Sequence, residues 1–305
     1  MSVPAGVLLV DKPVGPSSAA AVARVRRALG ERRVGHAGTL DPAASGLLVL
    51  GVGSGTRLLT FLVGLDKAYD ATIRLGIATD SDDAEGIVLS AVGCGAEVRV
   101  EPALAQLRGS IRQRPAAVSA IKVAGRRSYQ RVRSGEDVVL PARPVTVTAF
   151  EVRDRRTSTA GATPVVDLDV SVTVSSGTYV RALARDLGDL LGVGGHLTAL
   201  RRLRVGPFDV ADGVPWERLG PDARLLDLGA VARQVLPTVV LDGQETRAAA
   251  HGLRLPCDET AEPTALVAPD GRLVAVATCR DGRWKYHFVV AGVSDRLDSD
   301  SLERP

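Results

Sequence analysis

The chain has 305 residues, of which 45% are hydrophobic and 24% charged, and its formal net charge is +3. This composition is typical of a folded globular protein and excludes a disordered or fibrous one. The net charge is too small to indicate a nucleic-acid partner by itself. The length favours two unequal domains. No apolar run reaches the roughly 20 residues of a membrane span, and the N-terminus lacks the basic segment of a secretory signal, so we expect a cytoplasmic protein that contacts no membrane.

The first predicted elements are a buried strand and a positively charged helix. Residues 6–10 are apolar and lead into Asp11-Lys12-Pro13. Ser17 or Ser18 can cap a following helix, and Gly30 ends it. Five arginines in and after this helix give it a positive side that suits either solvent or RNA phosphates. They are Arg24, Arg26, Arg27, Arg32 and Arg33.

Two motif-like segments lack residues that their ligands require. Gly51 to Thr56 resembles a dinucleotide-binding loop, but Thr56 replaces the third glycine of G-x-G-x-x-G. Asp80 to Gly86 is acidic, but an EF-hand needs glycine at its sixth position and glutamate at its twelfth, where this chain has Glu85 and Ala91. We therefore expect neither a nucleotide nor calcium here, and we expect no metal or cofactor elsewhere.

The middle of the chain combines two strands with a basic excursion. Tyr69 to Leu75 and Val165 to Val174 alternate apolar and polar residues, which predicts strands. Between them, residues 111–145 carry eight basic and two acidic residues, a local charge of +6. A long excursion of this charge is suited to contact with phosphates.

A change of pattern from Pro237 indicates a small second domain. Residues 237–293 contain short β-rich runs and three Asp-Gly turns, of which those at Asp270 and Asp281 are flanked by apolar stretches as in hairpins. The six basic and seven acidic residues of this segment do not favour strong phosphate binding. We expect the polar tail 294–305 to be disordered.

The three cysteines are Cys94, Cys257 and Cys279. An odd number at wide spacings, with no C-x-x-C pair, fits neither a disulfide framework nor a zinc site. We therefore expect free thiols in a reducing compartment.

The segment around Asp41 is the strongest functional signal. Taken alone, Asp41 could be a helix N-cap before a first-turn proline. Its surroundings are Gly35-His36-Ala37-Gly38-Thr39-Leu40-Asp41-Pro42-Ala43-Ala44-Ser45-Gly46-Leu47-Leu48. This string closely resembles the catalytic G-H-x-G-x-L-D-P motif of TruB-type tRNA pseudouridine synthases. Further matches follow in that family's order, so that the resemblance covers roughly residues 6–209. They are Gly6 to Pro13, Lys67-Ala68-Tyr69, Arg114-Pro115 with Ser119 to Lys122, and Ser176 to Arg181.

The resemblance implies an isomerase that converts uridine to pseudouridine at position 55 in the T-loop of tRNA, without a cofactor. It assigns the nucleophile to Asp41, pairs Arg181 with that carboxylate, and lets Tyr69 pack on the flipped base and exchange a proton. The residues alone leave alternatives open, because Arg181 could bind a phosphate and Tyr69 could be an ordinary strand residue. They also leave open whether Asp41 attacks ribose C1′ or the uracil ring.

Five further residues are expected to bind the tRNA. By resemblance, His36 occupies the stack that the flipped base vacates, and Leu200 forms an apolar wall of the uracil pocket. The alternatives are a turn histidine and ordinary core packing. Lys122, Arg126 and Arg127 belong to the basic excursion and are expected to meet phosphates of the T arm. We expect a monomer that needs no protein partner, and the resemblance also allows a role in tRNA folding.

The implied fold class is α+β, the pseudouridine synthase fold, with a mixed, mostly antiparallel sheet flanked by helices. Residues 1–236 would form the catalytic domain, 111–145 a thumb-like RNA-binding insertion, and 237–293 a small PUA-like domain that extends RNA contact. One alternative is a non-catalytic RNA-binding module. Such modules stack bases on aromatic side chains, and the ten aromatic residues of this chain are few for that purpose. The other is a hydrolase built on Asp41 and His36, which would lack the usual G-x-S-x-G elbow or paired glutamates.

Overall fold

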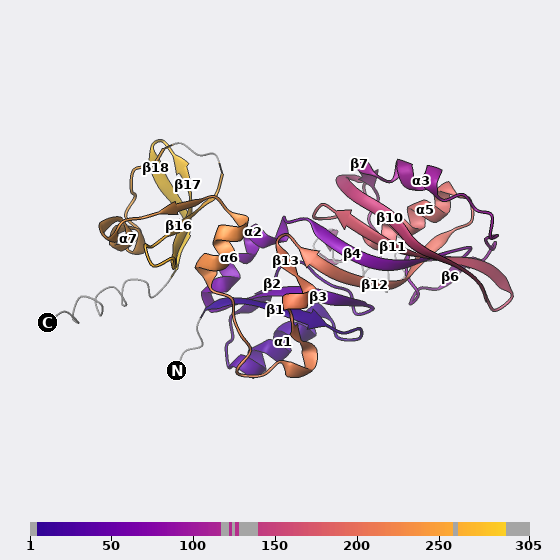
Figure 1. The fold of residues 1–305 in the computed structure, drawn as a ribbon, viewed down its shortest axis with the longest axis horizontal. Coiled ribbons are helices and arrows are strands. Elements are labelled where there is room, and N and C mark those ends of the chain that lie inside the picture. Colours follow the sequence, from indigo (N-terminus) through magenta and orange to yellow (C-terminus); the bar gives the residue numbers. More distant parts are fainter. Residues whose placement is uncertain (1–4, 117–121, 124–125, 128–139, 259–261, 291–305) are drawn as a thin grey trace.

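The structure, a computed structural model, describes residues 5–116, 122–123, 126–127, 140–258 and 262–290. The molecule is elongated, with a long twisted sheet in its larger part and a separate small sheet at one end (Figure 1). The expected α+β class is thus confirmed. Within the described residues, no helix is long and apolar enough to cross a membrane.

The large sheet is mixed and mostly antiparallel, as expected. Its strands run in the order β14-β1-β3-β12-β4-β11-β10-β7, with β2 beside β3 and β13 beside β12. Among the described pairs, β1 with β14 and β3 with β12 are parallel, and the rest are antiparallel. The strand bounds are β1 Gly6–Lys12, β2 Val34–His36, β3 Ala44–Val52, β4 Lys67–Leu75, β7 Gly109–Gln113, β10 Arg143–Ala160, β11 Thr163–Val174, β12 Gly195–Val205, β13 Phe208–Asp209 and β14 Val214–Pro215. A separate pair is formed by β5 Ala78–Thr79 and β6 Val88–Ser90.

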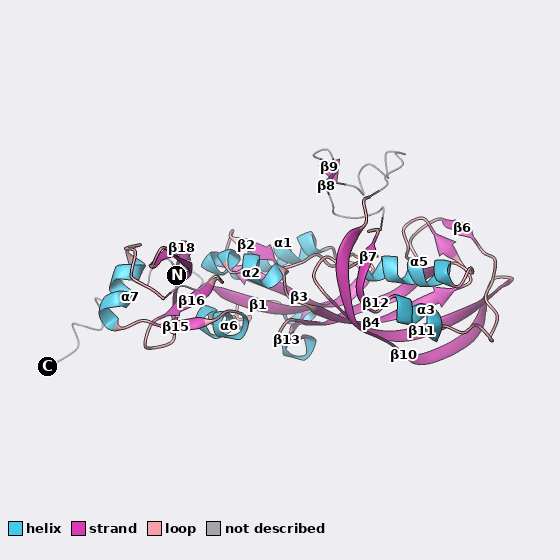
Figure 2. Cartoon of the chain, turned by 90° about the horizontal axis from the view of Figure 1, so that it is seen from above, coloured by secondary structure: helices cyan, strands magenta, loops and turns pink. Residues whose placement is uncertain are grey.

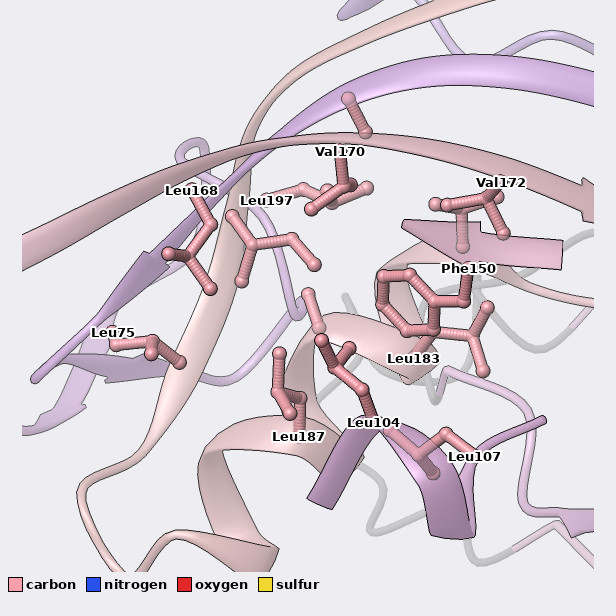
Figure 3. Close-up of a cluster of buried hydrophobic side chains, with 14 of the residues drawn as sticks. Leu75, Leu104, Leu107, Phe150, Leu168, Val170, Val172, Leu183, Leu187 and Leu197 are labelled. Carbon is pink, nitrogen blue, oxygen red and sulfur yellow. The ribbon is translucent and has the colours of Figure 1, made fainter. Parts of the chain in front are cut away.

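Helices cover both faces of the sheet near β1 and one face at the other end. Along β1 the side chains alternate, so that Leu8 packs towards α1 while Val7 packs towards α2 and α6. At the far end, α3 and α5 pack on β4, β10 and β11 through a cluster that includes Phe150 and Leu183 (Figure 3). The helix bounds are α1 Ser18–Leu29, α2 Leu59–Val63, α3 Glu101–Gln106, α5 Val180–Leu190, α6 Leu228–Val235 and α7 Gly243–Ala250, with short 3-10 turns at Gly53–Arg57, Val210–Asp212 and Trp216–Arg218.

The predicted boundaries of the first helix are confirmed. Ser17 is the N-cap of α1 and accepts a hydrogen bond from the backbone N–H of Ala20, and Gly30 ends the helix in the left-handed region at φ 63°. The glycine run after β3 has a packing explanation, since a Cβ on Gly55 would collide with the carbonyl of Gly6. Close backbone approach thus accounts for Gly51 and Gly55, and the left-handed φ of +59° accounts for Gly53.

The small sheet lies within residues 238–289 and shares a core with the large one. Its strands are β15 Thr238–Val240, β16 Thr264–Val267, β17 Leu273–Arg280 and β18 Arg283–Val289, in that order. The hairpin turns at Asp270 and Asp281 are confirmed, and the Asp-Gly pair at Asp242 begins a helix, with Asp242 as the N-cap of α7. Side chains of β16 and β17 join the core that contains α6 and β1. The small sheet is therefore packed against the larger part and not merely tethered to it.

The expectation of free cysteines is wrong for two of the three. Cys257 and Cys279 form a disulfide, with their Cα atoms 6.0 Å apart, and Cys94 is a free, buried thiol. Cys279 lies on β17 and Cys257 on the segment that follows α7, and Cys257 pairs through its backbone N–H with the carbonyl of Gly282. The fold of the small sheet, which linear spacing does not reveal, brings the two sulfurs together.

The basic excursion is described only in part. Lys122–Val123 and Arg126–Arg127 form the two-stranded β8–β9 hairpin, which stands clear of the large sheet in Figure 2. The rest of residues 117–139 lies outside the described residues, as does the tail 294–305.

Candidate active site

Asp41 lies on the loop that connects β2 to β3. The backbone N–H of Ala44 donates to the carbonyl of Asp41 at 3.1 Å, which closes a turn, and β3 begins at Ala44. No helix follows this residue, so the helix-cap interpretation of Asp41-Pro42 is wrong. Strand pairing on both sides of the loop overrides the local preference of the Asp-Pro pair.

Buried side chains from three distant elements hold this loop in place. Arg202 of β12 is 1% exposed and donates to the carbonyls of Gly38 at 3.2 Å, Thr39 at 3.4 Å and Leu47 at 2.7 Å. Lys12 of β1 donates to the carbonyl of Ala44. Ser18 of α1 exchanges two hydrogen bonds with the backbone of Leu40. These contacts fix the backbone on both sides of Asp41.

Arg181 pairs with Asp41, as the family resemblance implies. It is the second residue of α5, and its Nη2 lies 3.0 Å from Oδ2 of Asp41. The Arg181 side chain is 8% exposed and that of Asp41 43%, so the pair is open to solvent from the carboxylate side. The N-terminus of α5 adds positive potential at the same place. Gln113 of β7 fixes this helix start by bonding both backbone groups of Tyr179.

A second carboxylate, that of Asp83, pairs with the other terminal nitrogen of Arg181. Its Oδ2 accepts from Nη1 of Arg181 at 2.9 Å, and its Oδ1 accepts from the hydroxyl of Ser81 at 2.5 Å. The neighbouring Asp82 pairs instead with Arg185 at 3.0 Å, and burial raises the pKa of Asp82 to about 6. The acidic segment 80–86 thus supplies arginine partners, and Arg181 lies between two carboxylates.

A cavity of about 220 Å³ opens beside Asp41. It is smaller than the about 300 to 1,000 Å³ of drug-sized ligand pockets, so its size suits a single nucleobase. Tyr69, 8% exposed on β4, lines it together with Asp41, Arg181 and Leu200. Four of the predicted site residues therefore meet at one cavity. Leu200 also packs against the core, so its two interpretations are compatible.

Two lysines beside the loop have lowered pKa values. Burial is the main cause for both, and it brings the pKa of Lys12 and that of Lys67 to about 8. Arg202 lowers both further, and Asp41 opposes the effect at Lys12. Lys67 lines the cavity, whereas Lys12 is not among its lining residues.

Among the described side chains, His36 is the predicted site residue that does not line the cavity. His36 ends β2, is partly buried and is not among the lining residues. Lys122, Arg126 and Arg127 are placed by their backbone on the β8–β9 hairpin, and their side chains lie outside the description. In the part of the chain that the structure describes, no three His, Cys, Asp or Glu side chains are grouped as metal ligands.

Sequence reasoning missed Asp83, Lys67, Arg202 and Gln113. The pattern of the acidic segment around Asp83 indicates no arginine partner, and Lys67 belongs to the matched Lys67-Ala68-Tyr69 string, in which the resemblance assigns a role to Tyr69 alone. Their partners are far away in the chain, 98 residues for Asp83 with Arg181 and 164 for Arg202 with Gly38. For Lys67 and Arg202, the available signal was a charged residue at a strand position that is expected to be buried.

Comparison with known proteins identifies a family for the chain. Three family models match in succession: the TruB family pseudouridylate synthase N-terminal domain over residues 26–180, the tRNA pseudouridylate synthase B C-terminal domain over 181–241, and the tRNA pseudouridine synthase II C-terminal region over 236–291. The tRNA pseudouridine synthase B of Arthrobacter sp. (strain FB24) is 50% identical over 94% of this chain and 96% of its own length. That of Thermobifida fusca is 48% identical over 94% and 99%.

Solved structures show the same fold at low identity. A chain of a Cbf5–Nop10–Gar1 complex matches with a TM-score of 0.70 and 24% identity over 95% of this chain and 86% of that one. A chain of an archaeal box H/ACA Nop10–Cbf5 complex matches with a TM-score of 0.70 and 23% identity over 94% and 86%. These matches confirm the expected pseudouridine synthase fold. Together with the family models and the relatives, they show that the chain belongs to the TruB family of pseudouridylate synthases, enzymes that isomerise uridine in tRNA.

Proposed function

We propose that this chain isomerises the uridine at position 55 in the T-loop of tRNA, with Asp41 as nucleophile and without a cofactor. The observation that supports the proposal most is the ion pair of Asp41 and Arg181 at a nucleobase-sized cavity that Tyr69 also lines. A stacked T-loop uridine reaches such a cavity only after it is flipped out of the loop, which costs a few kcal/mol.

In the proposed reaction, Asp41 and Arg181 act on the flipped nucleotide as a unit. Arg181 holds Oδ2 of Asp41, which orients the carboxylate. The other oxygen, Oδ1, then forms a covalent bond with the nucleotide, which divides a difficult step into two easier ones. Tyr69 packs on the base, and its hydroxyl is available to exchange a proton. Leu200 supplies an apolar wall that excludes water from the reacting base.

Contacts outside the cavity would hold the rest of the tRNA. We assign phosphate contacts of the T arm to Lys122, Arg126 and Arg127 on the β8–β9 hairpin, and the vacated stack to His36. The small sheet would extend RNA contact beyond the T arm. We further propose that the enzyme acts as a monomer in the cytoplasm and needs no protein partner, which sizing in solution and cell fractionation can test.

The proposal is tested by mapping pseudouridine in an unmodified tRNA transcript after incubation with the protein. We expect one modified position in the T-loop, and no modification in a matched transcript that carries cytidine there. Modification at a different position would leave the enzyme class intact and reject the T-loop assignment.

A further inference from the structure

Three cations are buried around the Asp41 loop, and in the described part of the chain none of them forms an ion pair. Lys12, Lys67 and Arg202 are 0%, 7% and 1% exposed. Among the described residues, none of them has a carboxylate oxygen within ion-pair distance, and their donors go to backbone carbonyls instead. Burying a charge costs several kcal/mol unless something compensates it. A negative charge that forms next to these cations would therefore be strongly stabilised.

Two of the three cations face the cavity and converge on one point. Lys67 and Arg202 both line it. They meet at Gly38, which has φ +98° and no side chain, and a Cβ there would lie 3.6 Å from Cε of Lys67 and 3.7 Å from Nη1 of Arg202. The bare side of Gly38 is therefore bordered by both cations.

Both cations also have donor capacity to spare. Lys67 gives two hydrogen bonds to carbonyls, at 3.0 Å from Val63 and 2.6 Å from Leu65, while an ammonium group has three N–H donors. Arg202 gives three hydrogen bonds, while a guanidinium has five donors. Although burial and Arg202 lower the pKa of Lys67 to about 8, the lysine keeps most of its charge at neutral pH.

We propose that Lys67 and Arg202 form a cationic floor of the cavity that stabilises the detached uracil as an anion. This inference rests on the proposed function. When the C1′–N1 bond breaks, its electron pair stays on the uracil and spreads over N1, O2 and O4, while Asp41 bonds to C1′. The base then turns, C5 attacks C1′ and displaces the carboxylate, C5 loses its proton, and N1 takes one up. Fixed charges contribute most where charge develops away from water.

The experiment compares two tRNA transcripts in single-turnover reactions, one with uridine and one with 4-thiouridine at the target position. Sulfur makes the base a better anion, so its departure depends less on the protein, and the hydrogen on C5 is kept. Lys67→Gln removes the charge and Lys67→Arg retains it. Lys12→Gln is the matched control, because Lys12 is an equally buried cation that holds the same loop but does not line the cavity.

Lys67→Gln is expected to lower the single-turnover rate about 100-fold on the uridine transcript and only about 10-fold on the 4-thiouridine transcript. A loss of about 100-fold is typical when one stabilising donor is removed from an active site. Lys67→Arg should recover most of the rate on uridine. Lys12→Gln should slow both transcripts by the same factor, since misplacing Asp41 affects every base equally. If Lys67→Gln does not fold, Lys67→Met provides the same comparison with an apolar side chain of similar length.

Equal slowing of both transcripts by Lys67→Gln would overturn the inference and leave Lys67 with a role in positioning only. A change confined to tRNA affinity would also overturn it and indicate contact with a phosphate. If the wild-type protein forms no pseudouridine from the uridine transcript, the proposed function fails first, and that result is separate from either of the others.

Discussion

Asp83 should be required for full turnover because it holds Nη1 of Arg181 while Nη2 contacts Asp41. In Asp83→Asn the amide keeps the shape of the side chain but loses the charge that meets Nη1 of Arg181 at 2.9 Å. A hydrogen bond to a charged group contributes about 1.5 to 3 kcal/mol, and each 1.36 kcal/mol corresponds to a factor of ten in rate. If this energy serves to aim Arg181, kcat should fall about 10-fold to 100-fold.

Asp82→Asn is the matched control for this prediction. Asp82 is the adjacent residue, and its side chain is 7% exposed against 13% for Asp83, but it pairs with Arg185, which does not line the Asp41 cavity. The pKa of Asp82 is about 6, so the assays are run at about pH 8, where Asp82 is ionised. At that pH each substitution removes one negative charge, and the two variants can be compared directly. Both substitutions should shift the thermal melt, and only Asp83→Asn should lower the single-turnover rate.

Two results would refute the reasoning. Wild-type turnover by Asp83→Asn would show that the contact with Asp41 suffices to aim Arg181. Equal slowing by both variants would show that the packing of segment 80–86, and not the charge on Asp83, supports the active site.

Three further predictions concern other parts of the molecule. Tyr69→Phe should slow single-turnover catalysis while tRNA affinity stays the same, since the ring remains and the hydroxyl is lost; equal rates would limit Tyr69 to packing. Reversing charge at Arg126 and Arg127 to glutamate should weaken tRNA binding and flatten the slope of log affinity against log salt, and an unchanged slope would show that this hairpin points away from RNA. Truncation after Leu236 should lower the melting temperature sharply, because Leu228 and Val231 of α6 would no longer be covered by β16 and β17. Exposing two large apolar side chains lowers the free energy of unfolding by up to about 5 kcal/mol. A truncated protein that melts like the full chain would show that the shared core contributes little.

The parts of the fold that the sequence predicted are those set by local pattern. The helix Ser18–Leu29 has both a serine cap and a terminal glycine, and the stretch Tyr69 to Leu75 within the strand Lys67–Leu75 alternates strictly. Asp41 was found through a contiguous motif, and its pairing with Arg181 through the family resemblance. Each of these signals lies within a short stretch of the chain or in a matched motif.

The parts that were missed depend on contacts between distant segments. Arg202 and Lys67 read as ordinary charged residues of strands, and only the assembled sheet buries them beneath the Asp41 loop. Cys257 and Cys279 are 22 residues apart, and the small sheet brings them together. The Asp-Pro pair at Asp41 favours the start of a helix, but strand pairing on both sides of the loop prevents one from forming.

The role of Asp41 as nucleophile is tested most directly by Asp41→Asn on an unmodified tRNA transcript. Single-turnover pseudouridine formation and the Kd for tRNA are measured on the same protein preparation, after a cooperative melt shows that it is folded. The amide keeps the shape and removes the nucleophile, so we predict no detectable pseudouridine in the T-loop and a Kd within a few fold of wild type. Pseudouridine formation by Asp41→Asn at a rate near that of the wild type would contradict the assignment.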